Sequence, residues 1–160
     1  MDIGGHRLKE HFRLLLPLFG FIAAVWALRL VLDAAGASHK IISAFSVTVA
    51  SAVAIVLAVL LIHFRRFGSF SNVVTAVILL VVWSQLLVIL AIVFSVAIGR
   101  ENIFTAPEFS VPGDDPHHIK HILGHLTFGI GVESLFGAAV GCLLLLLLRM
   151  MLPLRSIKSK

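Results

Sequence analysis

The sequence predicts an all-α polytopic membrane protein, a single domain over residues 1–160 in which four transmembrane helices form an antiparallel bundle. Hydrophobic residues make up 59% of the chain and charged residues only 13%. A soluble domain is about half apolar and about a quarter charged. Because a small soluble domain leaves much of its surface exposed, a chain of this length could not hide so many apolar side chains from water.

Four apolar runs carry this prediction. They indicate helices at about 14–35, 41–64, 73–98 and 117–152, with an outer loop at 99–116. Each run reaches the length of about 20 residues that spans the hydrocarbon core of a bilayer. Valine and isoleucine are frequent, but open strands in lipid would leave backbone groups unpaired, so helices are expected. The first two connections are short, which makes neighbouring helices antiparallel.

The basic residues predict the orientation in the membrane. Nine of the thirteen Lys and Arg residues fall on one side of the predicted helices: Arg7, Lys9, Arg13, Arg65, Arg66, Arg149, Arg155, Lys158 and Lys160. Cytoplasmic loops carry an excess of Lys and Arg, so both termini are expected in the cytoplasm of a multi-pass cell-membrane protein. The basic clusters lie beside apolar runs without interleaved aromatic residues, which argues against nucleic-acid binding and leaves the lipid bilayer as the expected partner.

A segment rich in histidine and aspartate precedes the fourth apolar run. Its candidate metal ligands are Asp114, Asp115, His117, His118, His121 and His125. Asp115 suits the N-cap of a helix that begins near Pro116. His117, His121 and His125 recur every four residues and would then share one helix face. Such a face can bind a divalent metal such as zinc, titrate near neutral pH, or simply form the polar start of a helix at the interface.

Ionisable residues also occur inside the predicted spans. Arg29 and Glu133 lie at matching depths in the first and fourth helices, so we expect them to pair. Asp33, one turn above Arg29, is expected to reach His125, and Gln85 in the third helix extends this buried polar column. Charges in hydrocarbon are costly and mark either function or a buried pair that fixes helix docking.

Small residues predict close helix packing. Gly137 and Gly141 form a GxxxG pair in the fourth helix, and Ala50, Ala54 and Ala58 recur at helical spacing in the second. Small side chains allow two helix backbones to approach each other closely. These two faces either meet within the chain or serve a homo-oligomer or another membrane subunit.

The sequence favours a small non-enzymatic membrane protein, an accessory or scaffold subunit of a larger membrane assembly. The alternative is a metal- or proton-responsive transporter or sensor that uses the outer His/Asp cluster and a buried Arg–Glu pair. No nucleophile elbow or other catalytic pattern is present. A haem or pigment is disfavoured, because His39, His63 and His125 lie near the ends of the predicted helices rather than at their centres. The cofactor is otherwise left open, with a divalent metal as the candidate.

Overall fold

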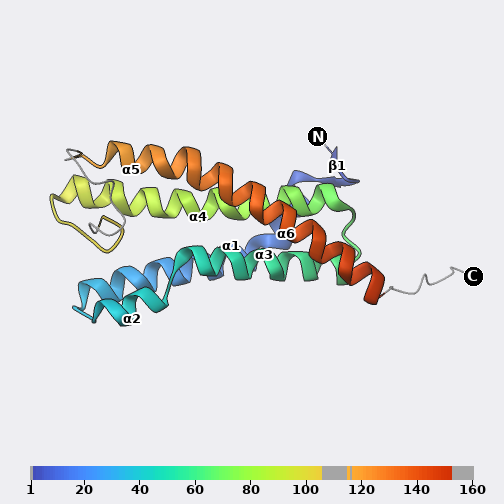
Figure 1. Ribbon diagram of the computed structural model, residues 1–160, viewed down its shortest axis with the longest axis horizontal. Coiled ribbons are helices and arrows are strands. Elements are labelled where there is room, and N and C mark those ends of the chain that lie inside the picture. The colour runs from blue at the N-terminus through green and yellow to red at the C-terminus, as the bar shows by residue number, and fades with distance from the viewer. Residues whose placement is uncertain (1, 106–114, 116, 153–160) are drawn as a thin grey trace, which may run out of the picture.

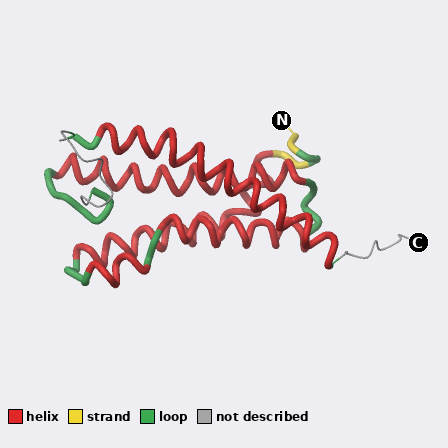
Figure 2. Tube along the Cα trace, in the orientation of Figure 1, coloured by secondary structure: helices red, strands yellow, loops and turns green. Residues whose placement is uncertain are grey.

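The computed structural model describes residues 2–105, 115 and 117–152, and these residues are mostly helical (Figures 1 and 2). A short antiparallel hairpin comes first. The elements are β1 (Asp2–Ile3), β2 (His6–Arg7), α1 (Leu8–Ala34), α2 (His39–Ala44), α3 (Val47–Phe64), α4 (Phe70–Ile98), α5 (Ile119–Gly124), the π-helix η1 (His125–Gly129) and α6 (Ile130–Met151). In Figure 1, β1 and the end of α6 lie at one end of the long axis, and α2 and α5 lie at the other.

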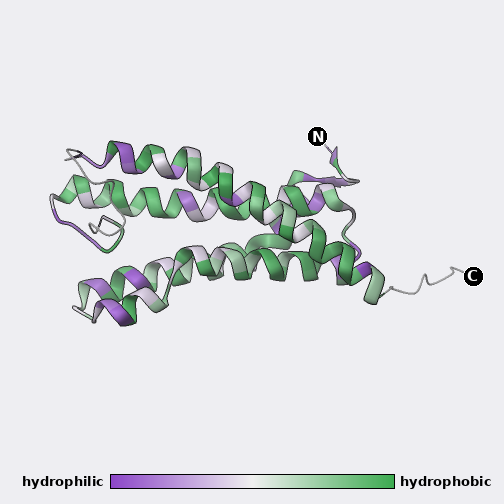
Figure 3. Cartoon of the chain, viewed as in Figure 1, coloured by the Kyte–Doolittle hydropathy of each residue, from purple (hydrophilic) through white to green (hydrophobic). Residues whose placement is uncertain are grey.

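Four helical stretches are long and apolar enough to cross a membrane. They are Leu8–Ala34, His39–Phe64, Phe70–Ile98 and Ile119–Met151. Figure 3 shows the hydrophobic residues along the helices, with hydrophilic residues gathered mainly towards the two ends. The prediction of an all-helical chain with four membrane-compatible helices is therefore confirmed.

The helices begin and end differently from the apolar runs at three places. The first helix starts at Leu8 rather than near residue 14, because the Glu10 carboxylate accepts a hydrogen bond of 2.7 Å from the backbone nitrogen of Arg7 and caps a polar first turn. The second run is interrupted between α2 and α3, where the Ser46 hydroxyl accepts from the backbone nitrogen of Val49 at 3.4 Å (Figure 2). The fourth helix starts at Ile119 rather than at residue 117.

The helices α3 and α4 form the interior of the fold. α4 packs against α1, α3 and α6, and α3 packs against α1 and α6. In the spans of α3 and α4, 44% of the most apolar stretch is buried, compared with 17% in the span that ends with α6. The fourth span therefore faces its surroundings more than the two central ones.

The predicted glycine face packs inside the chain. A Cβ atom at Gly137 would lie 2.9 Å from Cγ1 of Val77 and 3.1 Å from Cδ1 of Ile55. At Gly141 it would lie 3.0 Å from Cγ1 of Val73. The two glycines thus allow α6 to approach α3 and α4 closely.

Candidate functional site

Asp115 positions the start of the candidate site. Its carboxylate accepts hydrogen bonds from the backbone nitrogens of Ile119 at 2.9 Å, Lys120 at 2.9 Å and His121 at 3.3 Å. Aspartate is a preferred capping residue because its carboxylate satisfies N–H groups that have no partner within the helix. Asp115 thus accepts from the first turn of α5, but the N-cap residue of that helix is His118, three residues after the position that the sequence predicts.

The later start separates the predicted histidines. His118 has a left-handed backbone conformation with φ of 54°, and His117 lies exposed in the turn before α5. Only His121 and His125 remain one turn apart on the same face. Their ring centroids are 4.9 Å apart, and their Nε2 atoms are 3.1 Å apart. The prediction that His117 shares this face is therefore wrong, because the chain is not yet helical at that residue.

The histidine pair is connected to polar residues of α4 and α6. Nδ1 of His125 lies 2.6 Å from Oε1 of Gln85. The Gln85 side chain also interacts with the carboxylate of Glu133. We call His121, His125, Gln85 and Glu133 the histidine network. It joins three ionisable side chains through one amide, and it is partly or fully buried along its whole length.

Two backbone features make room for the histidine network. Residues 125–129 form a π-helical turn, a feature often found at functional sites. At Gly129, the last residue of this turn, an added Cβ atom would lie 2.7 Å from Oε1 of Gln85. A side chain at this position would therefore displace the amide that His125 contacts.

The carbonyl oxygen of Gln85 fixes the direction of the hydrogen bonds in the histidine network. The Gln85 carbonyl oxygen can only accept, so Nδ1 of His125 donates to it. In a neutral His125, Nε2 then accepts a hydrogen from Nε2 of His121. This assignment leaves Nδ1 of His121 as a lone-pair acceptor. That atom is buried and has no hydrogen-bond partner within the described part of the chain.

A cavity of about 260 Å³ lies beside the histidine pair. Its polar lining residues are Arg29, Ser43, Ser46, Thr48, His121 and His125. The guanidinium of Arg29 lies 4.9 Å from the ring centroid of Phe104, which forms part of an apolar wall. The break between α2 and α3 brings the three hydroxyl-bearing residues to this cavity.

The predicted polar column is only partly brought together. Gln85 lies beside His125 and interacts with Glu133, whereas Asp33 accepts a hydrogen bond of 2.9 Å from the backbone nitrogen of Ile103. Arg29 lies at the cavity, and the charge of Asp33 acts on it. The contacts described for Arg29 and Glu133 give them different neighbours, so an ion pair between them stays a prediction.

The predicted metal site is not supported by the described residues. Among them, no group of three or more His, Cys, Asp or Glu side chains is placed to hold a metal ion. Asp114, one of the proposed ligands, lies outside the described residues. Asp115 uses its carboxylate for the cap of α5, which occupies both oxygens with backbone N–H groups.

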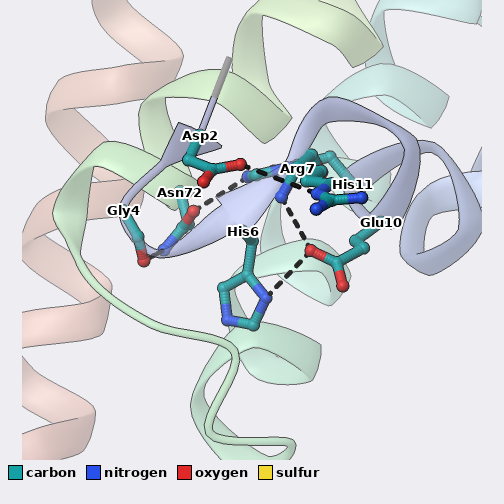
Figure 4. Close-up of polar contacts among 7 residues, drawn as sticks. All are labelled: Asp2, Gly4, His6, Arg7, Glu10, His11 and Asn72. Carbon is teal, nitrogen blue, oxygen red and sulfur yellow. Dashed lines mark hydrogen bonds and ion pairs between the residues drawn. The ribbon is translucent and has the colours of Figure 1, made fainter.

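A second polar cluster at the other end of the molecule was not predicted (Figure 4). Nε2 of His11 donates to Oδ1 of Asn72 at 2.9 Å, and Nδ1 of His11 lies 3.1 Å from the carbonyl oxygen of Arg7. The Asn72 amide nitrogen donates to the carbonyl of Gly4 at 3.2 Å. His11 and Asn72 are fully buried. No spacing pattern in the sequence links His11 to Asn72, which are 61 positions apart. The visible signal was a polar residue near the start of each of the two helices.

Comparison with known proteins gives no relative from which to transfer a function. No protein-family model, no curated protein and no solved structure matches the chain. The residues of the chain itself are therefore the basis for a proposal. Among the described clusters, the histidine network combines ionisable groups, burial and an adjoining cavity.

Proposed function

We propose that the chain is a multi-pass integral membrane protein that responds to protons through the histidine network, as a sensor or a carrier. The observation that carries the proposal is the pair of hydrogen bonds that joins His121, His125 and Gln85, together with the interaction of Gln85 with Glu133. Ionisable residues within apolar helices are rare and tend to mark proton relays or ligand sites. Histidine is the side chain whose charge changes most readily at physiological pH.

The membrane part of the proposal rests on the surface of the helices. Large apolar side chains face outwards, including Phe128, Leu135 and Met151, each at least 75% exposed. Lipid accommodates such a surface, whereas soluble monomers rarely expose large apolar patches. We place the helices as an antiparallel bundle with both termini in the cytoplasm, since the basic residues gather at that end. The histidine network then lies towards the outer side.

A proton has a defined place to bind in this network. Its binding atom is Nδ1 of His121, because that acceptor has no hydrogen-bond partner among the described residues. The singly protonated pair keeps the bond between the two Nε2 atoms, since one ring still donates and the other accepts. A second proton places a hydrogen on both Nε2 atoms, which breaks that bond. Protonation thus switches the pair between two arrangements.

The Gln85 amide within the histidine network favours a sensor or carrier over an open proton channel. Gln85 stands between His125 and Glu133, and its amide does not readily gain or lose a proton near neutral pH. A proton held by the histidines therefore acts on Glu133 through Gln85 without passing freely to it. Coupling of this kind biases a conformational equilibrium, as a ligand does.

Titration of the histidines by NMR tests the proposal. The protein in lipid nanodiscs, labelled with ¹⁵N at histidine, should show His121 and His125 titrating as a coupled pair. Gln85→Leu should change the titration of both residues. His117→Gln is the matched control, because His117 is exposed in the same segment and should leave the pair unchanged. Independent titration of His121 and His125, unaffected by Gln85→Leu, would contradict the proposal.

The exposure of the fourth span supports a second candidate, an accessory subunit of a larger membrane assembly. Only 17% of its most apolar stretch is buried within the chain. Gly137 and Gly141 already pack against α3 and α4, so a partner helix or a second copy would use the opposite face, which carries Leu135 and Phe136. Native mass spectrometry from detergent or nanodiscs should show an oligomer that Leu135→Asn disrupts. A monomer at all concentrations would exclude the homo-oligomer.

A further inference from the structure

An apolar groove runs between α1 and α4. Its volume of about 680 Å³ lies within the range of about 300–1,000 Å³ that is typical of ligand sites. Its lining residues come from these two helices alone, and each of them is an aliphatic residue, an aromatic residue or a glycine. On α1 they recur at helical spacing, at Phe12, Leu16, Phe19 and Ala23. The groove therefore follows one face of α1 and offers its occupant an almost wholly apolar surface.

Aromatic rings hold this groove in shape. Nε1 of Trp83 on α4 donates to the backbone carbonyl of Phe19 on α1 at 3.1 Å. The ring of Phe19 lies edge-on to that of Trp83 and tilted to that of Phe12, with centroids 5.8 Å apart in both pairs. Because the hydrogen bond fixes the indole against α1, this wall of the groove is formed before any ligand binds.

A glycine leaves space in the middle of the groove. Gly20 lies inside α1, where glycine is less favourable than alanine because it gives up more backbone freedom on folding. A Cβ atom added there would meet nothing within 4 Å. A larger side chain at this position would therefore occupy the groove without colliding with the protein.

The length of the groove distinguishes a lipid chain from a helix of a second copy. Phe12 and Ala23 are eleven positions apart, which corresponds to about 16 Å along a helix that rises about 1.5 Å per residue. The hydrocarbon core of a bilayer is about 30 Å thick, so the groove is about one leaflet deep. A transmembrane helix of a partner would contact the surface over both leaflets. An acyl chain of one leaflet ends where the groove ends.

Two basic side chains lie where the groove begins. Lys9 precedes Phe12 by three residues, and Arg13 precedes Leu16 by three residues. Residues three apart are neighbours on a helix, so both cations lie on or beside the face of α1 that lines the groove. Both side chains are exposed. They place positive charge at one end of an apolar groove, which is the arrangement that a lipid with an anionic headgroup requires.

The acidic residues at this end of the molecule are engaged elsewhere. The Glu10 carboxylate accepts from the backbone nitrogen of Arg7 and lies 3.5 Å from Nδ1 of His6. Oδ1 of Asp2 lies 4.0 Å from Nε of Arg7 (Figure 4). The ion pairs described at this end of the chain include neither of the two cations that flank the groove. Both cations are therefore available to a phosphate group.

We infer that this groove binds one phospholipid with an anionic headgroup, its acyl chain lying between α1 and α4 and its phosphate at Lys9 and Arg13. The inference rests on the membrane part of the proposed function, and it is independent of the histidine network. The proposed orientation places the start of α1 at the cytoplasmic leaflet, whose anionic lipids attract basic residues that flank a transmembrane helix. The two cations select the headgroup, and the groove holds a single acyl chain.

Quenching of Trp83 fluorescence by brominated lipids tests the inference. The chain has two tryptophans, so Trp26→Phe leaves Trp83, which lines the groove, as the only one. This variant is reconstituted in vesicles in which either the phosphatidylglycerol or the phosphatidylcholine carries bromine on its acyl chains. Bromine quenches an indole only at close contact, so the quenching reports which lipid occupies the groove. We expect an apparent affinity for phosphatidylglycerol at least about fivefold higher than that for phosphatidylcholine.

Removing the charges tests the headgroup contact. Lys9→Gln and Arg13→Gln should each weaken the preference for phosphatidylglycerol by up to about fivefold, the factor that one basic residue contributes near an anionic surface. Lys40→Gln is the matched control, because Lys40 is an exposed lysine in α2, at the other end of the molecule (Figure 1). It should leave the preference unchanged. An undiminished preference in the double variant of Lys9 and Arg13 would overturn the phosphate site.

Filling the groove tests the acyl-chain contact without touching a charge. Gly20→Leu should reduce the quenching by brominated phosphatidylglycerol to that by brominated phosphatidylcholine, because the leucine takes the space of the bound chain. Gly131→Leu is the matched control, since a Cβ atom at Gly131 also meets nothing within 4 Å and this residue of α6 does not line the groove. Quenching that Gly20→Leu leaves unaltered would overturn the acyl-chain site. A change of oligomeric state in that variant, measured by native mass spectrometry, would assign the groove to a second copy instead.

The inference and the proposed function fail in different ways. Equal quenching by the two brominated lipids overturns the phospholipid site and leaves the membrane placement intact. A protein that does not float with the vesicles in a density gradient overturns the membrane placement itself. The titration of His121 and His125 is measured separately, so its outcome bears on the proton response alone.

Discussion

Two positions on α4, Asn72 in its first turn and Gln85 at its centre, each hold a histidine against an amide, but they differ in what the amide contacts next. Asn72 accepts from His11 and donates to the backbone carbonyl of Gly4. Gln85 accepts from His125 and interacts with the carboxylate of Glu133. A backbone carbonyl has one chemical state, whereas a carboxylate has two. The first amide therefore locks the structure, and the second connects it to an ionisable group.

The surroundings of the two histidines reinforce this contrast. His11 is fully buried and both of its ring nitrogens lie near oxygen atoms (Figure 4). His121, the neighbour of His125, lines a cavity. Its buried Nδ1 atom has no hydrogen-bond partner among the described residues. His11 thus joins α1 to α4 through its hydrogen bond to Asn72, whereas His121 keeps a buried nitrogen that is available for a proton.

The largest expected loss of stability comes from breaking the contacts of Asn72 with His11 and Gly4. Gly68 has φ of +114°, and a Cβ atom there would collide with the Asn72 side chain and lie 3.2 Å from the carbonyl oxygen of Gly4. Gly68→Ala should therefore displace Asn72 and leave His11 without its partner. We expect a loss of about 3 kcal/mol of stability, combining backbone strain and an unsatisfied buried group. Reversible unfolding in mixed micelles, followed by circular dichroism, measures it.

Gly36→Ala is the matched control for this variant. Gly36 also has a positive φ, of +72°, but a Cβ atom there would meet nothing within 4 Å. Its replacement should cost only the backbone strain, about 1 kcal/mol. Equal losses in the two variants would show that the contact between Gly68 and Asn72 adds nothing to stability.

The four helices long and apolar enough to cross a membrane could be predicted from the sequence, because they follow from composition and length. The break between α2 and α3 could not, because Phe45 and Ser46 continue a run in which apolar residues and helix-compatible spacing persist. A single serine that caps a new helix changes the average hydropathy of the run very little. The polar first turn at Leu8–His11 was missed for the related reason that only apolar residues defined the helix start.

The site was predictable to the extent that it is local. The one-turn spacing of His121 and His125 and the capping role of Asp115 are short-range properties, and both are visible in the sequence. His117 was wrongly included because the left-handed conformation of His118 cannot be read from residue types. The pairing of His11 with Asn72 depends on the packing of α1 against α4, which no local pattern encodes.

An intermediate loss of stability is expected from breaking the contact between Gln85 and His125. A Cβ atom at Gly129 would lie 2.7 Å from Oε1 of Gln85, so Gly129→Ala should move the amide away from His125. The expected cost is about 1–2 kcal/mol, because the displaced side chain is the end of a flexible residue. The coupled titration of His121 and His125 should be lost in the same variant. Histidine NMR in nanodiscs and micellar unfolding measure the two quantities.

Gly131→Ala separates the contact from the change in helix propensity. Gly131 lies two residues further along, in α6, and an added Cβ atom would meet nothing within 4 Å. Alanine there should be neutral or stabilise the helix by up to about 1 kcal/mol. If Gly131→Ala also abolished the coupled titration, the contact between Gly129 and Gln85 would not be the cause.

The smallest expected loss of stability comes from removing the carboxylate that accepts from the first turn of α5, the helix that carries His121. The Asp115 carboxylate accepts from the backbone nitrogens of Ile119 and Lys120, each at 2.9 Å. Asp115→Ala removes both acceptors and should destabilise the first turn of α5 by about 1 kcal/mol. Asp115→Asn keeps one acceptor oxygen and should lose less. Amide hydrogen exchange at Ile119 and Lys120 measures the change, which should be confined to this turn. Faster exchange around His11 as well would mean that the contacts of Asn72 and those of Gln85 are coupled along α4, and that the first set does not hold its structure independently of the second.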